Sequence, residues 1–436
     1  MLTTDGGLFV RTHPREKGKG IWYGAQANTR AMEILFGDWD SRLSRYISGA
    51  QDNLVQITPP KGAPDHLTAA AFLGCDGTRT GVDNVHCPAR MFGSCQFLDG
   101  LSMFYATNAS DVKSPLLTTV ALNVTESIFT NPYNFPFFVP AWAINAQDPT
   151  ELVLWVNGTE AEKTKTGLYR LSLPSDPQEL LATPPQHELL ATVDGLILDI
   201  KAGGRNHGKL STKVITAINN THIITLDDNI LSVHPLPSKF AVPVHLHAVK
   251  HGDWALGPLG HGSTVFVSVS PADRNHVAVT GWPEDYNHGK EGVWYSTNAG
   301  TTWRNIMGDL TNASGTIARV RPNGVLIMEF EEYNFDCVLV GTVNGVFVTF
   351  TDNASIGKWT RLGSLRDFPR VLNYGLSYEP YSDTLVAATY GRGVYALHRA
   401  RELLYRHHHQ RLGTHSAHDA QLLPSSRFFP KQHACA

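Results

Sequence analysis

Acidic side chains recur along this chain in short turns, directly before a glycine or an asparagine. Asp5 precedes a Gly-Gly pair, and Asp52 precedes an asparagine. Two carboxyl groups about 5 to 10 Å apart, one protonated and the other ionised, can hydrolyse a glycosidic bond. We therefore take Asp5 and Asp52 as the candidate catalytic pair. Because Asp-Gly and Asp-Asn are also favoured pairs in tight turns, a purely structural role is the alternative.

A second set of polar and aromatic residues stands in turns of the same kind and could bind a ligand. Carboxylates and a guanidinium form hydrogen bonds with polar ligands, and a tryptophan offers a flat apolar face. The candidate ligand-binding residues are Asp76, Asp99, Trp282, Glu284, Asp285 and Arg392. Arg392, in a Gly-Arg-Gly turn, could equally bridge the first and last repeat units.

Histidines and cysteines are the side chains that would hold a transition metal. His245 and His247 would share one face of a strand, as zinc ligands can, but no third ligand follows at an obvious spacing. The five cysteines lack the CxxC spacing of a zinc site and could form at most two disulfides. We therefore expect no metal and no cofactor.

A short phrase of glycine, an apolar residue and an aromatic residue returns along the chain and indicates a repeat protein. Its last three copies begin at Gly292, Gly345 and Gly393, about 50 residues apart. Around these copies lie short β-type runs bounded by Gly, Pro, Asn or Asp. Units of about 50 residues with four such runs are typical of propeller blades. The predicted fold class is all-β, a β-propeller of about seven four-stranded blades.

The number of repeat units predicts how the ring closes. Six complete units fit between residues 25 and 365, which leaves an N-terminal fragment and a C-terminal fragment, 366–398. Joined, the two fragments would make a seventh blade and remove exposed sheet edges. We expect the propeller domain to span residues 1–398. The His-rich segment 399–436 is predicted to be a short helix followed by a disordered, flexible tail.

The order of strands within a blade predicts which turns share a face. In an antiparallel meander, the turns between strands two and three emerge on the same side as the links between blades. The turns between strands three and four emerge on the other side. The candidate residues all fall in turns or links of the first kind, so we expect them to ring one face. The turn from Ser296 to Trp303 would lie on the opposite face.

That turn carries a recognisable motif. Residues 296–303 match the Asp-box (BNR) pattern Ser-x-Asp-x-Gly-x-x-Trp, with Asn298 in place of Asp. In such a turn the Asn side chain accepts backbone N–H groups, glycine takes a positive φ and Trp packs under the hairpin. With Thr4-Asp5-Gly6-Gly7 and the closing Tyr390-Gly391-Arg392-Gly393, the motif resembles the Asp-box propellers of the sialidase, xyloglucanase and sortilin superfamily.

The resemblance covers about residues 1–398 and implies the fold more firmly than an activity, because the superfamily includes hydrolases, sorting receptors and non-catalytic binders. The turn around Asp5 is one residue shorter than the catalytic turn of xyloglucanases, whose partner acid lies on a second propeller. The Phe/Tyr-Arg-Ile-Pro motif of sialidases is missing. A sortilin-type receptor would add a Cys-rich module and a membrane anchor, which this sequence lacks.

These departures leave three hypotheses. The leading one is a non-catalytic, sortilin-like propeller that binds a glycan, peptide or protein on its loop-rich face. The second is a glycoside hydrolase that acts on polysaccharide through two of the turn aspartates. The third is a structural scaffold that makes protein contacts at its rim.

Composition and sequons bear on partners and compartment. A net charge of −3 argues against nucleic acid, and no run of 18 apolar residues predicts a membrane span. Six Asn-x-Ser/Thr sequons favour a glycoprotein that is secreted or lies in the secretory or endosomal lumen. The first residues do not resemble a signal peptide, and the chain opens within a repeat unit. We therefore expect the natural start to lie upstream. The expected glycosylation sites are Asn108, Asn123, Asn157, Asn219, Asn312 and Asn353.

Overall fold

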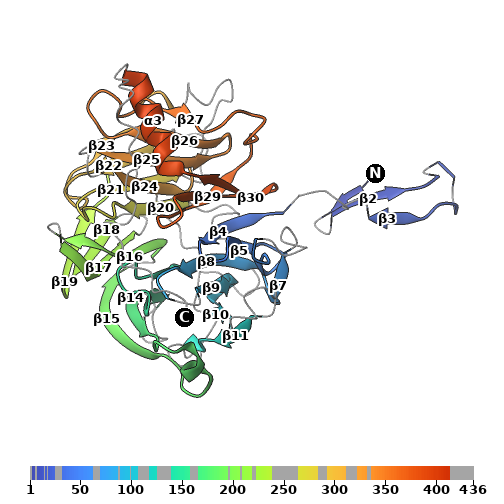
Figure 1. The fold of residues 1–436 in the computed structure, drawn as a ribbon, viewed down its shortest axis with the longest axis horizontal. Coiled ribbons are helices and arrows are strands. Elements are labelled where there is room, and N and C mark those ends of the chain that lie inside the picture. The colour runs from blue at the N-terminus through green and yellow to red at the C-terminus, as the bar shows by residue number, and fades with distance from the viewer. Residues whose placement is uncertain are drawn as a thin grey trace.

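The computed structural model gives the fold as a ring of β-sheets (Figure 1). The structure describes residues 2–4, 7–13, 15–16, 18–24, 32–61, 69–86, 89–98, 100–106, 117–124, 139–157, 165–194, 197–206, 209–218, 222–237, 264–282, 292–310, 322–330 and 335–412.

Each repeat unit is a sheet of antiparallel strands taken in sequence order. Blade 1 contains β4 (Ile34–Asp40), β5 (Arg45–Ala50), β6 (Val55–Ile57) and β7 (Ala70–Leu73). Blade 2 contains β8 (Gly77–Asp83), β9 (Arg90–Cys95), β10 (Ser102–Tyr105) and β11 (Thr118–Ala121), with the 3-10 helix η1 (Gln96–Leu98) after β9. Blade 3 contains β12 (Trp142–Ile144), β13 (Glu151–Asn157), β14 (Lys165–Ser172) and β15 (Gln186–Asp194), with the 3-10 helix η4 (Pro177–Leu181) before β15.

The second half of the chain continues the same pattern. Blade 4 contains β16 (Asp199–Asn206), β17 (Lys209–Ile218), β18 (His222–Asp227) and β19 (Ile230–Pro235). Blade 5 contains β20 (Thr264–Val269), β21 (Val277–Trp282), β22 (Gly292–Ser296) and β23 (Arg304–Asn305). Blade 6 contains β24 (Val325–Phe330), β25 (Phe335–Thr342), β26 (Gly345–Phe350) and β27 (Thr360–Arg361). Blade 7 has three described strands, β28 (Asn373–Glu379), β29 (Thr384–Thr389) and β30 (Gly393–His398).

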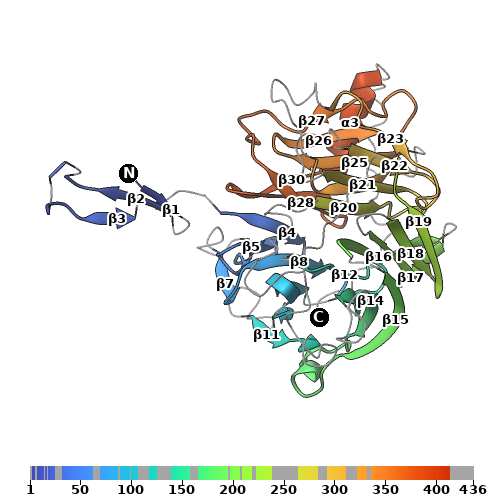
Figure 2. The same cartoon turned by 180° about the vertical axis from the view of Figure 1, so that it is seen from behind.

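The first strand of every blade lies at the inside of the ring. Each of these strands packs beside the first strand of the next blade, in the order β4, β8, β12, β16, β20, β24, β28 and back to β4. Figure 2 shows the same arrangement from behind. The prediction of seven antiparallel blades is therefore confirmed.

Burial explains why the strands differ in sequence pattern. Central strands such as β25 and β26 read as nearly continuous apolar runs because neighbouring blades cover both of their faces. The outermost strand β19 has no fully buried residue, and its Ile230 and Val233 side chains are 69% and 49% exposed. Hydrophobic clusters fill the spaces between blades, and one of them joins residues of blades 5, 6 and 7 to Leu35 of blade 1.

Ring closure differs from the prediction. The N-terminal strands β1 (Leu2–Thr4), β2 (Gly7–Arg11) and β3 (Trp22–Gly24) form a sheet of their own, which projects away from the ring in both views (Figures 1 and 2). Their backbone groups are paired with each other, and among the described residues they do not complete blade 7. The ring closes instead where β4 packs beside β28, with a hydrogen bond of 2.8 Å from Ser377 Oγ to the carbonyl oxygen of Gly37.

The expected C-terminal helix is present and is part of the folded body. Helix α3 (Ala400–Leu412) begins where the carboxylate of Asp383 accepts the backbone N–H of Arg401 at 2.6 Å. Leu404, Tyr405 and His408 are buried against blades 6 and 7. The described fold therefore extends beyond the predicted boundary at residue 398, and the predicted tail from residue 413 lies outside the described residues.

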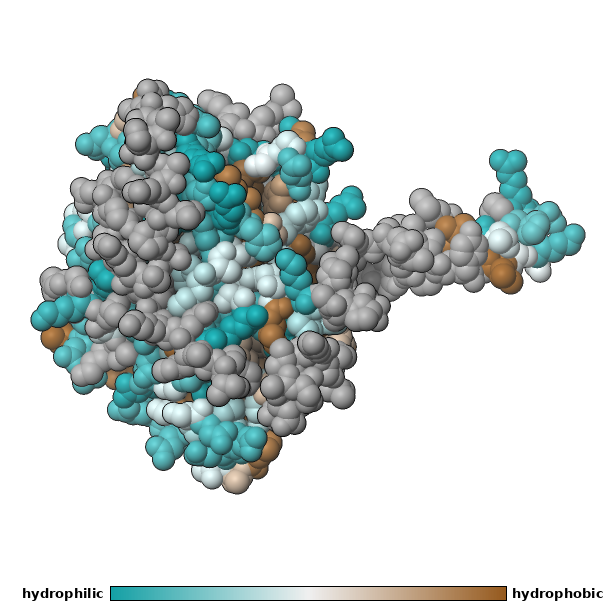
Figure 3. All heavy atoms as spheres, viewed as in Figure 1, coloured by the Kyte–Doolittle hydropathy of each residue, from teal (hydrophilic) through white to brown (hydrophobic). Residues whose placement is uncertain are grey.

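In the view of Figure 3, hydrophilic side chains cover much of the described surface and hydrophobic ones are scattered. No helix among the described residues has the length and apolar character needed to cross a membrane.

Candidate functional site

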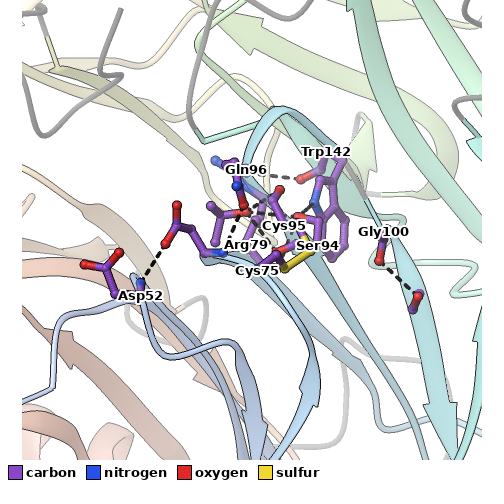
Figure 4. The surroundings of a disulfide bond; sticks show 11 residues. Asp52, Cys75, Arg79, Ser94, Cys95, Gln96, Gly100 and Trp142 are labelled. Carbon is purple, nitrogen blue, oxygen red and sulfur yellow. Dashed lines mark hydrogen bonds between the residues drawn. A yellow bond between two sulfur atoms is a disulfide. The ribbon is translucent and has the colours of Figure 1, made fainter. Parts of the chain in front are cut away.

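The predicted catalytic residue Asp52 lies in the turn between β5 and β6 and has a positive φ of 57°. Its backbone N–H donates a hydrogen bond of 2.7 Å to Oδ1 of Asp76, in the link between β7 and β8 (Figure 4). The backbone N–H of Asp76 in turn donates to Oε1 of Gln96 at 3.0 Å. The structure thus brings Asp52 and Asp76 together on the predicted face, and Asp76 serves as an acceptor for a turn amide.

Arg392 lies next to this group. Its side chain is exposed in the turn between β29 and β30, and the neighbouring Tyr390 donates a hydrogen bond of 3.3 Å to Oε1 of Gln51. Blades 1 and 7 therefore meet beside Asp52 through Tyr390 and Gln51. Trp282 ends β21. The predicted residues Asp5, Asp99, Glu284 and Asp285 and the histidines His245 and His247 lie outside the described residues.

A disulfide lies beside the turns that contain Asp52 and Asp76. Cys75 and Cys95 are joined, with their Cα atoms 5.7 Å apart (Figure 4). This bond ties the link before β8 to the end of β9, beside the turn that holds Asp76. Cys337 is buried and has a free thiol. No group of three metal-ligating side chains occurs in the described part of the chain.

A cavity of about 290 Å³ with polar groups in its lining lies inside the ring. Strands β4, β8, β12, β16 and β28 line it, together with the turns that follow β8, β12 and β28. Five charged side chains come from four of these strands: Asp38, Arg79, Asp83, Lys201 and Glu379. The cavity lies at the ends of the first strands, where the turns to the second strands emerge. By topology this is the face opposite to Asp52, Asp76 and Arg392.

Arg79 organises the wall of the cavity. Its Nη2 donates to Oδ1 of Asp199 at 2.6 Å, and its Nη1 donates to the carbonyl oxygen of Trp142 at 3.1 Å. Its guanidinium also lies over the ring of Phe36, 4.8 Å from the centroid. Burial alone would raise the pKa of Asp199. The charges of Arg79 and Lys201, with the hydrogen bonds from Arg79 and from the backbone N–H of Val267, outweigh this effect and lower that pKa. Arg79 thus connects blades 1 to 4 as half of a buried ion pair.

Asp38 lines the cavity, and the environment of its carboxyl group differs from that of Asp199. The hydroxyl of Thr80 donates to its Oδ2 at 2.6 Å. Burial raises the pKa of Asp38, and the hydroxyls of Thr80 and Ser377 oppose that rise only in part. Asp38 is therefore easier to protonate than an ordinary aspartate.

The carboxylates at the cavity rim cap their own turns. Asp83 accepts the backbone N–H groups of Val85 and His86 at 2.8 and 3.1 Å, and Glu379 accepts those of Tyr381 and Ser382 at 2.9 and 2.7 Å. In blade 3, the side chain of Asn145 plays the same role after β12, where its Oδ1 accepts the backbone N–H of Gln147. These residues hold the turns after the first strands in shape, because each satisfies amides that would otherwise lack partners.

Lys201 has a cationic side chain that lines the cavity. It lies two residues after Asp199 on β16, so both side chains point to the same side of the strand. Burial lowers the pKa of Lys201, and the charges of Asp199 and Asp38 partly offset this effect. Sequence reasoning missed both residues. The available signal was an Asp and a Lys spaced by two within an otherwise apolar β-run, which places charge on an inward face.

The turn from Ser296 to Trp303 has the internal bonding that its residues predict. Oδ1 of Asn298 accepts the N–H of Thr302 at 2.8 Å, and Oγ of Ser296 accepts that of Gly300 at 2.9 Å. Gly300 has φ of +86°, and a Cβ there would meet Ile223 at 2.3 Å, so glycine is required. Trp303 packs against the cluster between blades 4 and 5. This turn therefore stabilises the fold through its own bonds and the packing of Trp303.

Two predicted glycosylation sites have accessible side chains. Asn123 follows β11 and Asn353 follows β26, and both are exposed. Asn157 ends β13. The remaining sequon residues, Asn108, Asn219 and Asn312, lie outside the described residues.

Comparison with solved structures bears on the fold. An ancestral GH74 enzyme matches with a TM-score of 0.53 and 11% sequence identity, over 89% of this chain and 51% of that one. A GH74 enzyme of Niastella koreensis matches with a TM-score of 0.49 and 12% identity, over 84% and 52%. U3-55K matches with a TM-score of 0.46 and 9% identity, over 82% and 88%. The chain spans about half the length of the two GH74 structures, and the first match shows a shared propeller fold.

No family model matches this sequence, and no curated protein matches it.

Proposed function

We propose that this protein is a non-catalytic ligand-binding propeller whose ligand enters the cavity inside the ring. The observation that carries the proposal is the cavity itself, of about 290 Å³, with charged side chains from four blades on its wall. A concave site with a few converging polar groups is the usual form of a small-ligand site. Its walls come largely from strands, and side chains of the wall cap the adjoining turns, so the site is preformed and binding orders little of the chain.

The bonding of the carboxylates favours binding over hydrolysis. A glycosidase needs one protonated and one ionised carboxyl group facing the same bond. Asp38 has the environment of the acid, but Asp83, Asp199 and Glu379 are each bonded to backbone amides or to arginine. On the other face, Asp76 is bonded to the amide of Asp52. A free ionised partner for Asp38 is thus missing among the described cavity residues.

The more specific part of the proposal, a sortilin-like binder in the secretory route, rests on the turn at residues 296–303 and on the disulfide. The internal bonding of residues 296–303 supports an Asp-box turn and a place among sortilin-like binders. A structural disulfide and accessible sequons are typical of secreted and lumenal proteins, so we place the protein in the secretory route. A glycan, peptide or protein chain reaching the cavity by its end would satisfy this proposal.

The experiment combines binding and turnover on the same samples. Purified protein is tested on a glycan array and a peptide panel, and reducing-end release from polysaccharides is measured in parallel. Ala146 is exposed at the cavity wall, so Ala146→Trp should occlude the site and abolish binding. Ala182→Trp, at an exposed position beyond η4, is the matched control and should bind like the wild type.

Two results would overturn the proposal. Reducing-end release that is lost in Asp38→Asn or Asp52→Asn would establish the hydrolase alternative. Unchanged ligand binding by Ala146→Trp would move the site away from the cavity, towards the face of Asp52 and Arg392.

A further inference from the structure

Lys201 carries a positive charge into the cavity without a bonded counter-ion. Among the described residues, no acceptor lies within hydrogen-bond distance and no carboxylate within ion-pair distance of its Nζ atom. Asp199 and Asp38 act on its charge through space only. Lys201 is half-buried, and an ammonium that is partly withdrawn from water without a bonded partner is costly, so its place in the fold needs an explanation.

The nearest carboxylates are already committed to other donors. Oδ1 of Asp199 accepts from Arg79 and from the N–H of Ile200, and Oδ2 accepts from the N–H of Val267 at 3.1 Å. Oδ2 of Asp38 accepts from Thr80. These bonds hold both carboxyl groups back against the ring wall. The remaining positive charge faces the empty volume.

The lining near the mouth has a different character. Ala143, Ile144, Ala146 and Pro149 form an apolar wall on the side of blade 3. On the side of blade 7, Tyr378 and Tyr381 line the cavity, and the Tyr378 hydroxyl donates to Asp383 at 3.1 Å. A ligand that fits would therefore place an anionic group deep, at Lys201, and an apolar or hydroxyl-bearing body towards the mouth.

We propose that the cavity is a carboxylate-binding site, in which Lys201 pairs with the carboxylate of a small organic acid no larger than a hexuronic acid. The inference rests on the proposed function, because it names the ligand class of the same cavity. A volume of about 290 Å³ limits the buried part of the ligand to roughly one sugar ring. The carboxylate takes the place of the counter-ion that Lys201 lacks, and two charges at contact in a partly enclosed site attract more strongly than they do in bulk water.

The test is titration calorimetry with defined probes. Sodium glucuronate and sodium lactate represent the two sources of the carboxylate, an acidic sugar and a simple hydroxy acid, and glucose is the neutral match for glucuronate. We expect glucuronate to bind at least tenfold more tightly than glucose. Tighter binding of lactate than of glucuronate would identify the simple acid as the source. Because the attraction is electrostatic, affinity should fall as salt is added.

Variants separate charge from packing. Lys201→Met should lose at least tenfold in glucuronate affinity, and Lys201→Arg should retain part of it. Lys209→Gln removes an exposed lysine of the neighbouring strand β17 and should bind like the wild type. Melting curves recorded on every variant exclude loss of fold as the cause.

The outcomes keep the two proposals apart. Equal binding of glucose and glucuronate, full affinity in Lys201→Met, or no binding of either acid would overturn the carboxylate site. The cavity proposal is judged separately, by whether Ala146→Trp abolishes binding of the ligand found on the array or panel.

Discussion

Arg79 and Asp199 are 120 residues apart in the sequence and 2.6 Å apart in the ring, where they join blade 2 to blade 4. Blade 3 lies between them, and its Trp142 carbonyl oxygen accepts a second hydrogen bond from the same guanidinium. Both side chains are almost fully buried, at 6% and 2% exposure. One arginine thus fixes the relative positions of three blades at the wall of the cavity.

Removing this arginine should destabilise the fold strongly. Arg79→Met would leave Asp199 buried without its counter-ion, and such changes typically cost about 3 to 5 kcal/mol. Denaturant unfolding followed by tryptophan fluorescence measures the loss. Arg392→Ala, at an exposed arginine, is the control and should stay within about 0.5 kcal/mol of the wild type. A cost below about 1 kcal/mol for Arg79→Met would show that the pair does not brace the ring.

Helix α3 offers a comparison between neighbouring leucines. Leu404 is 1% exposed and packs on blades 6 and 7, whereas Leu403 is 43% exposed. Leu404→Ala should lower the free energy of unfolding by about 2 to 5 kcal/mol, because it leaves a cavity under the helix. Leu403→Ala should change it by less than about 0.5 kcal/mol. Thermal and denaturant unfolding measure both variants. Equal destabilisation by Leu404→Ala and Leu403→Ala would contradict the docking of the helix.

The same helix should become less stably docked in acid. His408 is 3% exposed between the rings of Phe335 and Phe350, and burial lowers its pKa below 6.5, with Asp352 opposing. A lowered pKa in the folded state means that the unfolded state binds the proton more readily, so stability is lost as pH falls below about 6.5. His408→Leu should lose less stability than the wild type between pH 7 and pH 5. Parallel pH curves for the two proteins would refute this.

The contribution of His276 to stability should depend on pH in the opposite direction to that of His408. Its Nδ1 lies 2.7 Å from Oδ2 of Asp336, and this hydrogen bond raises the pKa of His276 above 6.5. The protonated form is favoured by folding, so its contribution is fully present below about pH 6.5 and is lost as pH rises through the folded-state pKa. The stability advantage of the wild type over His276→Gln should therefore shrink from pH 6 to pH 8. Titration of the histidine by NMR checks the direction of the shift.

The disulfide should stabilise the face that contains Asp52 and Asp76. Cys75 and Cys95 are 20 residues apart, and closing a loop of that size contributes about 3 kcal/mol in the chain-entropy account. Adding a reductant should lower the melting temperature of the wild type. Cys75→Ala should melt at the reduced value with or without reductant. An unchanged melting temperature on reduction would mean that the bond does not form in solution.

Local sequence patterns predicted the repeating elements well, because short-range physics decides them. The Gly-apolar-aromatic phrase at Gly292, Gly345 and Gly393 marks the start of β22, β26 and β30. The bonding of Asn298 within its turn involves residues only four apart, so it could be read without a structure. The placement of Asp52 in the turn between β5 and β6 followed from the strand count in the same way.

The pairing of distant strands was harder to predict. The N-terminal strands carry the same Gly-apolar-aromatic phrase as a true blade, yet β1 to β3 pair with one another and leave blade 7 with three described strands. Similar strand edges offer the same backbone groups, so local pattern does not choose between partners. The contact of β4 with β28 decides where the ring closes.

The sequence by itself determined that this protein is a seven-bladed antiparallel propeller with turn-capping acids, since periodicity, turn residues and burial are properties of neighbouring residues. Only the tertiary structure decided which charges meet. Asp38, Arg79 and Lys201 stand in three separate β-runs with no characteristic spacing, and closing the ring brings them to one cavity. Their pKa values and bonding depend on that closure, because burial and charge act over distances in space rather than along the chain.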